Sequence, residues 1–250
     1  MSALGLGLAV FAGVVSGLLF GAYPEIDLWA SGLFFDRTGD TFPASHSVTF
    51  ALLRSVNIYL FAGVLTGFCI FFAAAAFGAS AASKREAAAR AFWLLALTAI
   101  IGPGLIVNGL LKEQWGRPRP GAVAQFNADA ENSFTPWWRT DGGCKSNCSF
   151  VAGEASIAFW LLAPATLIRR RRSRRTAYAA VFAVASLAGL LRIAVGGHFL
   201  SDVVFAGAIV FVVVWLTHRV IYRVPAFDAF FTGKREPKIA SQASPAGAAG

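Results

Sequence analysis

Two separated groups of charged residues have the types and the spacing that phosphate chemistry needs. The first group holds three cations within eight residues, Lys112, Arg117 and Arg119. Lysine supplies a compact positive charge, and arginine donates paired hydrogen bonds to phosphate oxygens. Pro118 and Pro120 end a helix and extend the backbone there. Basic side chains that reach lipid headgroups from a helix end would give the same pattern, so this group needs support from the other.

The second group runs from Arg192 to Asp202 and contains a histidine. His198 stands four residues before Asp202, and Gly196–Gly197 break the helix just before it. That spacing puts both side chains on one face of the next helix, so we expect Asp202 to accept the imidazole N–H. The contact would fix the tautomer and leave the other ring nitrogen free to attack phosphorus. A buried histidine beside an aspartate also occurs as plain structure.

The chain that must position these groups is unusually apolar. Of its 250 residues, 56% are hydrophobic and 14% charged, and its mean hydropathy is +0.61. Soluble domains carry about 25% charged residues, so a water-soluble globule is excluded. In a membrane protein, the formal net charge of +9 indicates basic cytoplasmic loops and no nucleic-acid partner. We therefore predict an all-α, polytopic membrane protein with six transmembrane helices in one bundle.

Six apolar stretches are candidates for these helices, at 3–23, 55–83, 91–111, 155–168, 176–191 and 203–217. The first has no basic segment before it and no clear cleavage site after it, so we interpret it as a helix rather than a signal peptide. The last three reach full length only by including Glu154, Arg192 or Asp202. Because ionisable residues at membrane depth are costly, these three are candidate site residues independently of any motif.

Charge fixes the expected orientation. The loops at 84–90, 169–175 and 219–238 carry 14 Lys and Arg residues against 3 Asp and Glu, whereas the alternate loops carry 8 against 10. The positive-inside rule places both termini in the cytoplasm and the charged groups on the outer, periplasmic face of a bacterial inner membrane. We expect a membrane domain at 1–222 and a cytoplasmic, largely disordered tail at 223–250. A short segment at 24–29 is interpreted as an interfacial anchor.

The outer loops also contain Cys144 and Cys148, four residues apart. Their oxidising compartment favours a disulfide, which would stiffen the approach to Glu154. Two free thiols are the alternative, and a metal site is disfavoured because no histidine or second cysteine pair is close in sequence.

At this point the residues resemble a known family. Lys112, six residues and then Arg119-Pro120, followed later by Arg192, five residues, His198, three residues and Asp202, is similar to the motif set of the type 2 phosphatidic acid phosphatase superfamily. The resemblance extends to the six-helix layout and covers roughly residues 1 to 220.

The resemblance implies a metal-independent lipid phosphate or diphosphate phosphatase that needs no cofactor. It implies that His198 attacks phosphorus to give a phosphohistidine and that Asp202 orients it. The phosphate-binding candidates are Lys112, Arg119 and Arg192, with Arg117 as an auxiliary cation and the backbone N–H of Gly153 as an oxyanion donor. The expected partners are the bilayer and a membrane lipid phosphate.

The middle motif departs from the family. Where the family reads Pro-Ser-Gly-His, this chain reads Val151-Ala152-Gly153-Glu154. The family's histidine protonates the leaving oxygen, and Glu154 stands in its place. A carboxyl at membrane depth resists ionisation and could donate that proton, although nearby cations act against this. We predict that Glu154 is catalytic or substrate-orienting, the alternative being a degenerate motif in a weakly active protein.

Two other functions remain open at this stage. A phosphohistidine can also pass its phosphoryl group to a second lipid, which would make a phosphotransferase. A catalytically weak, lipid-phosphate-binding accessory protein could keep the fold without the reaction. Among possible substrates, polyprenyl diphosphate and lipid A phosphates rank first because an outward-facing site could reach them; phosphatidic acid and phosphatidylglycerol phosphate follow.

Overall fold

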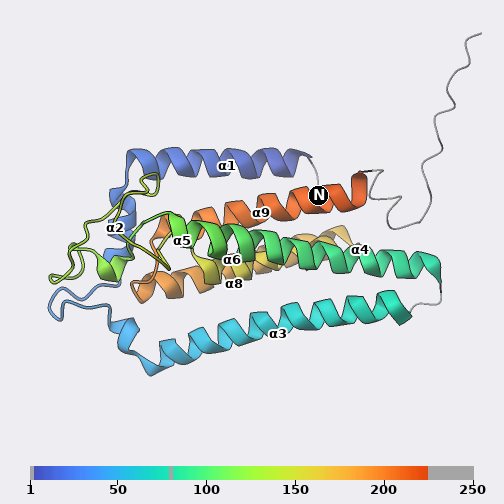
Figure 1. Cartoon of the computed structure of the whole chain (residues 1–250), viewed down its shortest axis with the longest axis horizontal. Coiled ribbons are helices and arrows are strands. Elements are labelled where there is room, and N and C mark those ends of the chain that lie inside the picture. Colours follow the sequence, from blue (N-terminus) through green and yellow to red (C-terminus); the bar gives the residue numbers. More distant parts are fainter. Residues whose placement is uncertain (1–2, 79–80, 225–250) are drawn as a thin grey trace, which may run out of the picture.

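The protein is a bundle of helices that run side by side, as Figure 1 shows for the computed structural model, which describes residues 3–78 and 81–224. Its α-helices are α1 (Ala3–Ala22), α2 (Glu25–Gly32), α3 (Val48–Gly78), α4 (Ala82–Ala99), α5 (Lys112–Gln114), α6 (Gly153–Trp160), α7 (Leu162–Thr166), α8 (Arg171–Ala194) and α9 (Leu200–Arg223). Two short 3-10 helices, η1 (Pro43–His46) and η3 (Pro120–Ala122), and a π-helix, η2 (Ile100–Leu111), complete the secondary structure. No β-strand occurs within the described ranges, so the all-α class is confirmed.

Five helices in the described part of the chain are long and apolar enough to cross a bilayer. They are α1, α3, the continuous helix Ala82–Gln114, α8 and α9. The expected fourth span, 155–168, is not among them, because the chain there is split into α6 and α7. Pro164 has no N–H to donate to the carbonyl of Trp160, and α6 ends at that residue. The predicted count of six spanning helices is therefore not confirmed.

The continuous helix Ala82–Gln114 changes its winding before it reaches the site. Pro103 cannot donate to the carbonyl one turn earlier, and the stretch Ile100–Leu111 adopts the wider π pattern. The side chain of Asn108 adds a local contact, because its Nδ2 donates to the Pro103 carbonyl at 2.6 Å. The helix then ends beside the start of α6, where a Cβ at Gly153 would lie 3.0 Å from Lys112 Nζ. Lys112 therefore lies next to the middle motif, Val151-Ala152-Gly153-Glu154.

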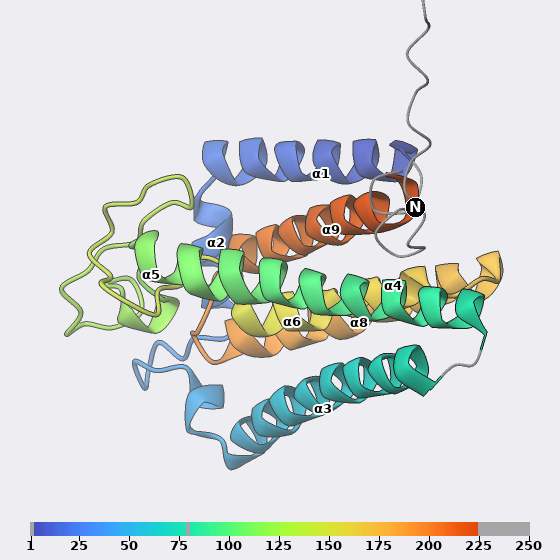
Figure 2. The same cartoon turned by 45° about the vertical axis from the view of Figure 1, so that its right-hand side comes forward.

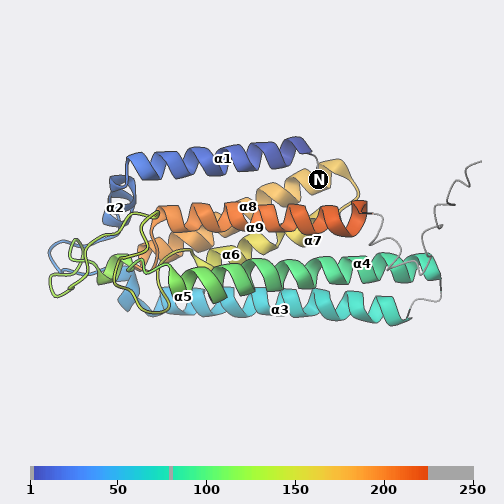
Figure 3. The ribbon, with the colours of Figure 1, turned by 45° about the horizontal axis from the view of Figure 1, so that its top comes forward.

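The loops gather at two opposite ends of the bundle. In Figures 1 and 2, the long connections 33–47 and 115–152 lie at the end where α2 and α5 are found, together with the turn between α8 and α9. Figure 3 shows the end of α3, the start of α4 and the start of α8 at the far end. Within the described residues, the basic segments 84–90, 169–175 and 219–224 therefore lie at the opposite end of the bundle from the two long connections.

Burial follows the pattern of a protein in lipid. The core lies around α6, where Phe159, Trp160 and Leu162 are buried against α8, α9 and η2. Large apolar side chains point outward along α1 and α3, including Phe11 and Phe77, which is 90% exposed. Such a surface suits hydrocarbon rather than water. The expected domain 1–222 contains almost all described residues, whereas the expected tail lies outside them except for 223 and 224.

Candidate active site

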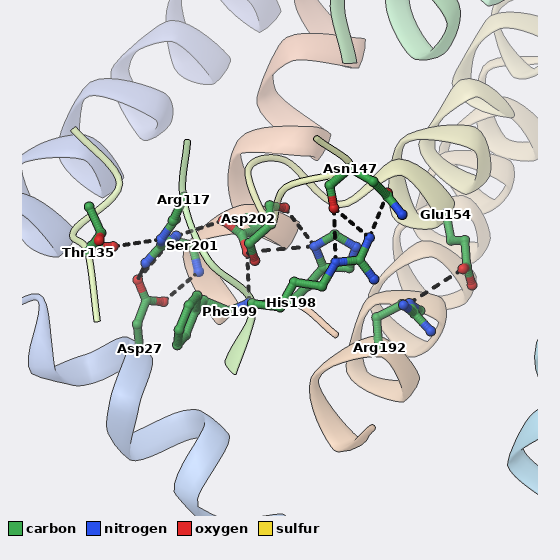
Figure 4. A network of polar contacts seen from close by, with 12 residues as sticks. Asp27, Arg117, Thr135, Asn147, Glu154, Arg192, His198, Phe199, Ser201 and Asp202 are labelled. Atoms are coloured by element: carbon green, nitrogen blue, oxygen red, sulfur yellow. Dashed lines mark hydrogen bonds and ion pairs between the residues drawn. The ribbon is translucent and has the colours of Figure 1, made fainter. Parts of the chain in front are cut away.

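The candidate site lies at the loop end of the bundle, where three segments that are distant in sequence meet. His198 lies in the turn between α8 and α9, Arg192 in the last turn of α8 and Glu154 in the first turn of α6. Figure 4 shows His198 between two charged groups: Asp202, Arg117 and Asp27 on one side, and Glu154 with Arg192 on the other. The two halves of the site differ in burial and in pairing.

The candidate nucleophile, His198, is buried and held through one ring nitrogen. Its Nδ1 lies 2.7 Å from the carbonyl oxygen of Ser149 and 3.7 Å from Asp202 Oδ2. A carbonyl only accepts hydrogen bonds, so Nδ1 carries the proton and the lone pair is on Nε2. The contact with Asp202 that the spacing predicts is present, but the shorter contact of Nδ1 is with the Ser149 carbonyl.

Electrostatics keep this imidazole neutral. Burial lowers the pKa of His198, and the positive charges of Arg192 and Lys112 lower it further, whereas Asp202 opposes the shift. A neutral imidazole with a free Nε2 is the form that can attack phosphorus.

Asp202 is fully buried and surrounded by donors. Its Oδ1 accepts from Arg117 Nη1 at 2.6 Å, and its Oδ2 accepts from Ser149 Oγ at 2.5 Å and from the backbone N–H of Phe199 at 2.8 Å. Ser149 therefore touches both members of the predicted pair, since its carbonyl holds His198 and its hydroxyl holds Asp202. Sequence reasoning missed Ser149, whose only signal was its position directly after Cys148.

Arg117 does not reach the phosphate side of the site, which corrects its expected role as an auxiliary phosphate ligand. Its side chain is fully buried. Besides Asp202, it donates to Asp27 Oδ2 at 2.8 Å, to the Thr135 carbonyl at 2.8 Å and to Ser201 Oγ at 2.8 Å. All of these partners are buried, so the guanidinium of Arg117 has a structural role.

Cys144 and Cys148 form a disulfide in the structure, and the loop they close lies along residues 112–117. The backbone N–H groups of Cys144, Cys148 and Ser149 donate to the carbonyls of Gly116, Lys112 and Arg117 at 2.8–3.0 Å. These backbone hydrogen bonds hold the Ser149 carbonyl next to Nδ1 of His198. Asn147, inside the loop, accepts from Arg119 Nη2 through its carbonyl at 2.9 Å and through Oδ1 at 2.7 Å.

A cavity of about 510 Å³ lies next to Gly196 and Gly197, the two residues before His198. Its charged lining is Arg54, Arg119, Glu154 and Arg192, and its apolar wall comes from α3 and α8. Lys112 lies within electrostatic reach of all four of these groups. Four cations around one cavity, with a single carboxylate among its lining residues, form a site for a multiply charged anion.

Arg192 has a buried donor without a hydrogen-bond partner among the described residues. This donor is its Nε, and the residue is 7% exposed. The nearest acceptor is Glu154 Oε1 at 3.4 Å. Gly197 leaves the space that the guanidinium fills, because a Cβ there would lie 2.5 Å from Arg192 Nη2. A buried donor without a partner is costly, so a ligand oxygen would relieve it.

Glu154 is bound by arginines on two sides. Its Oε1 accepts from Arg54 Nε at 2.9 Å and faces Arg192 Nε, and its side chain is 16% exposed. Arg54, on α3, belongs to none of the motifs, and sequence reasoning used it only to mark the end of a loop. One carboxylate oxygen therefore faces two arginine side chains at the wall of the cavity.

Gly153 starts α6 next to these cations. The first N–H groups of a helix have no partner inside it and carry a partial positive charge. Ala152, just before, is held by its N–H to the Asp202 carbonyl at 3.1 Å. The start of α6 is thus fixed to α9, and it lies beside the side chain of Lys112.

No group of three or more His, Cys, Asp or Glu side chains within 3–78 and 81–224 is placed to hold a metal ion. The structure brings together Lys112, Arg119, Gly153, Glu154, Arg192 and His198, and it places Asp202 behind His198. Of the predicted phosphate ligands, it excludes only Arg117.

Comparison with known proteins agrees with this arrangement. A family model described as the PAP2 superfamily matches residues 91–225, just over half of the chain. The matched region contains both charged groups and the middle motif. No solved structure is significantly similar to the chain.

Three curated bacterial relatives carry the name lipid A 4′-phosphatase. The protein of Francisella tularensis subsp. novicida is 42% identical over 134 residues, which cover 54% of this chain and 60% of the relative. The protein of Rhizobium leguminosarum is 36% identical over 222 residues, covering 82% of this chain and 87% of the relative. The protein of Rhizobium etli is 34% identical over 221 residues, covering 82% and 79%.

With its apolar helices and its cation-lined cavity, this multi-pass membrane protein is a phosphatase, a phosphoric monoester hydrolase. The chain belongs to the type 2 phosphatidic acid phosphatase (PAP2) superfamily.

Proposed function

We propose that the protein removes a phosphate monoester from lipid A, at the 4′ position named for its relatives, through a phosphohistidine at His198. The observation that carries the reaction is a buried imidazole with its lone pair on Nε2, next to a cavity lined by cations. The substrate is taken from the relatives that match over most of their length. The apolar wall supplied by α3 and α8 suits a substrate with acyl chains.

The first step binds and attacks the phosphate. Lys112, Arg119 and Arg192 bind the phosphoryl oxygens, and the N–H of Gly153 adds a neutral donor. Nε2 of His198 forms a bond to phosphorus, while the bond between phosphorus and the sugar oxygen breaks. The sugar oxygen takes a proton from solvent. The imidazole becomes cationic, and Asp202 stabilises this charge.

The second step releases phosphate. Water attacks phosphorus from the cavity, the bond to Nε2 breaks, and the proton lost by water returns to solvent. His198 is neutral again. In this scheme Glu154 orients Arg54 and Arg192 toward the phosphate rather than donating a proton.

We also propose that the site faces the periplasm, with both termini in the cytoplasm and α6–α7 as a broken sixth crossing. The support is the charge of the loops, because the described basic segments 84–90, 169–175 and 219–224 lie at the end of the bundle away from the site. Labelling a cysteine introduced at Asp129 with a membrane-impermeant reagent in intact cells tests this orientation.

The direct test is incubation of the purified, detergent-solubilised protein with lipid A. We expect free inorganic phosphate and a lipid product that has lost one phosphate at the 4′ position by mass spectrometry. His198→Ala should release none. His218→Ala is the matched control, because His218 stacks on Tyr222 far from the site. Transfer of the phosphoryl group to a second lipid, without free phosphate, would instead identify a phosphotransferase.

A further inference from the structure

Asp27 is a buried carboxylate that no motif contains. It lies on α2, in the segment interpreted from sequence as an interfacial anchor, yet it is 1% exposed. Its Oδ1 accepts the backbone N–H of Ser201 at 2.8 Å, and its Oδ2 accepts Ser201 Oγ at 2.6 Å. Asp27 thereby satisfies one of the free N–H groups in the first turn of α9, the turn that carries Asp202.

Arg117 joins the two carboxylates. One terminal nitrogen of its guanidinium donates to Asp27 and the other to Asp202, as the left half of Figure 4 shows. The rings of Phe199 and Phe134 lie 4.3 and 5.5 Å from its Cζ, so water is kept from this charge. An unscreened guanidinium in direct contact with Asp202 would by itself cancel much of the charge that Asp202 presents to His198.

The net charge of Asp27, Asp202 and Arg117 favours the formation of a phosphohistidine at His198. Two carboxylates face one guanidinium, which leaves one negative charge while His198 is neutral. Attack on phosphorus converts the imidazole to a cation, and the cluster then becomes neutral. The pKa of the Asp27 carboxyl is raised overall, by burial and by the like charge of Asp202, whereas Arg117 and both donors of Ser201 act in the opposite direction and favour its charged form.

We propose that Asp27 and Arg117 are positioning residues for the nucleophile. Arg117 fixes Asp202 behind His198, and Asp27 offsets the charge of Arg117 so that Asp202 can stabilise the imidazolium. The proposal rests on the phosphohistidine mechanism above, and it assigns a reaction role to α2.

The charged groups that face His198 set the direction of the expected pH effect. Asp202 faces it from α9, Arg192 from α8 and Lys112 from the end of the η2 helix. Removing the charge of Asp27 leaves Arg117 opposed by Asp202 alone. The imidazolium is then less stable, so the pKa of His198 falls, and the acidic limb of the rate profile moves to lower pH.

The test compares Asp27→Asn with the parent and with Glu25→Gln, a matched control on the same helix at an exposed position. The amide keeps the shape of the side chain but not its charge. We expect kcat on lipid A to fall about tenfold or more, with KM little changed, and the acidic limb of kcat/KM to move down by about one pH unit. Ionisation of the substrate is the same for all three proteins, so a difference in the limb reports the enzyme. Glu25→Gln should match the parent.

A lower kcat with an unmoved acidic limb would mean a purely structural role and would overturn the proposal, as would an unchanged kcat. If Asp27→Asn does not fold, Ser201→Ala decides, because it removes the hydroxyl between Asp27 and Arg117. A smaller shift of the limb in the same direction is expected, and no shift would reject the inference. Trapping of radiolabelled phosphate on the parent enzyme separates the two claims. No label on His198 defeats the proposed function, whereas a labelled parent with an unmoved limb in the variants defeats only this inference.

Discussion

The two carboxylates of the site, Asp202 and Glu154, are held in opposite ways. Asp202 is fully buried, and the groups that donate to it, Arg117, Ser149 and the backbone of Phe199, come from the protein interior. Glu154 lines an open cavity and pairs with Arg54, whose side chain is 54% exposed. The Arg117–Asp202 and Arg54–Glu154 ion pairs both have short distances, so the two carboxylates differ mainly in the surroundings of their ion pairs.

That difference separates two tasks. A buried, fully paired network cannot exchange partners without a large cost, so it can set the tautomer and charge of His198 in advance. A pair at a cavity wall gives up its partner cheaply, because solvent and ligand can replace it. The buried network around Asp202 therefore sets the state of His198 before the substrate binds. At the cavity wall, the arginines that bind the carboxylate of Glu154 can bind a phosphate in its place.

The largest effect should come from the buried side. We expect His198→Ala to reduce kcat by at least about 10³-fold, because a covalent nucleophile is lost. Arg54→Ala, on the open side, should reduce kcat/KM about tenfold and act mainly through KM, because it removes binding shared by substrate and transition state. Steady-state kinetics of both variants on lipid A measure the contrast. Equal losses in the two variants would remove the distinction between the halves.

A smaller effect should follow from opening the disulfide. Replacing both Cys144 and Cys148 by Ser frees the loop that holds the Ser149 carbonyl under His198. We expect kcat to fall about tenfold, since a nucleophile that is slightly misplaced reacts more slowly. Cys69→Ser is the matched control, because Cys69 lies on α3 and is not paired. Parent-like kcat in the double variant would show that the backbone contacts to 112–117 suffice without the bridge.

Sequence reasoning succeeded where charge and spacing leave few alternatives. Lys112, Arg192 and His198 are charged or titratable groups at the ends of apolar stretches, and membrane depth penalises such groups unless they meet a partner. Their convergence follows from the alternation of helices between the two ends of the bundle. Pro164, which breaks the expected fourth span, was visible in the sequence, and its effect on the helix was not used.

The site residues that sequence reasoning missed are placed by contacts between segments that are far apart in the chain. Asp27 meets Ser201 across 174 positions of the chain, and Arg54 meets Glu154 across 100. Neither pair has a spacing that local periodicity could reveal. Arg117 and Arg119 are two residues apart with the same charge, so composition could not tell which turns inward. Arg117 turns inward because two buried carboxylates and two aromatic rings surround its guanidinium.

The smallest and most diagnostic effect concerns Glu154. The amide in Glu154→Gln keeps the shape but not the charge, so Arg54 and Arg192 lose their counter-ion. We expect turnover to fall only a few-fold, about equally for an alkyl phosphate and an activated aryl phosphate, because orientation rather than proton donation is lost. Inorganic phosphate should inhibit the variant more strongly than the parent, since two arginines without a carboxylate bind an anion better.

Glu131→Gln controls for loss of a negative charge on the same face, because Glu131 is exposed. Initial rates on the two substrates and the inhibition constant for phosphate are the measurements. Slowing confined to the alkyl phosphate would restore the proton-donor role, because only a poor leaving group needs an acid. Unchanged inhibition by phosphate would mean that the arginines are not released from Glu154 when an anion binds, and the exchange assigned to the open half of the site would fail.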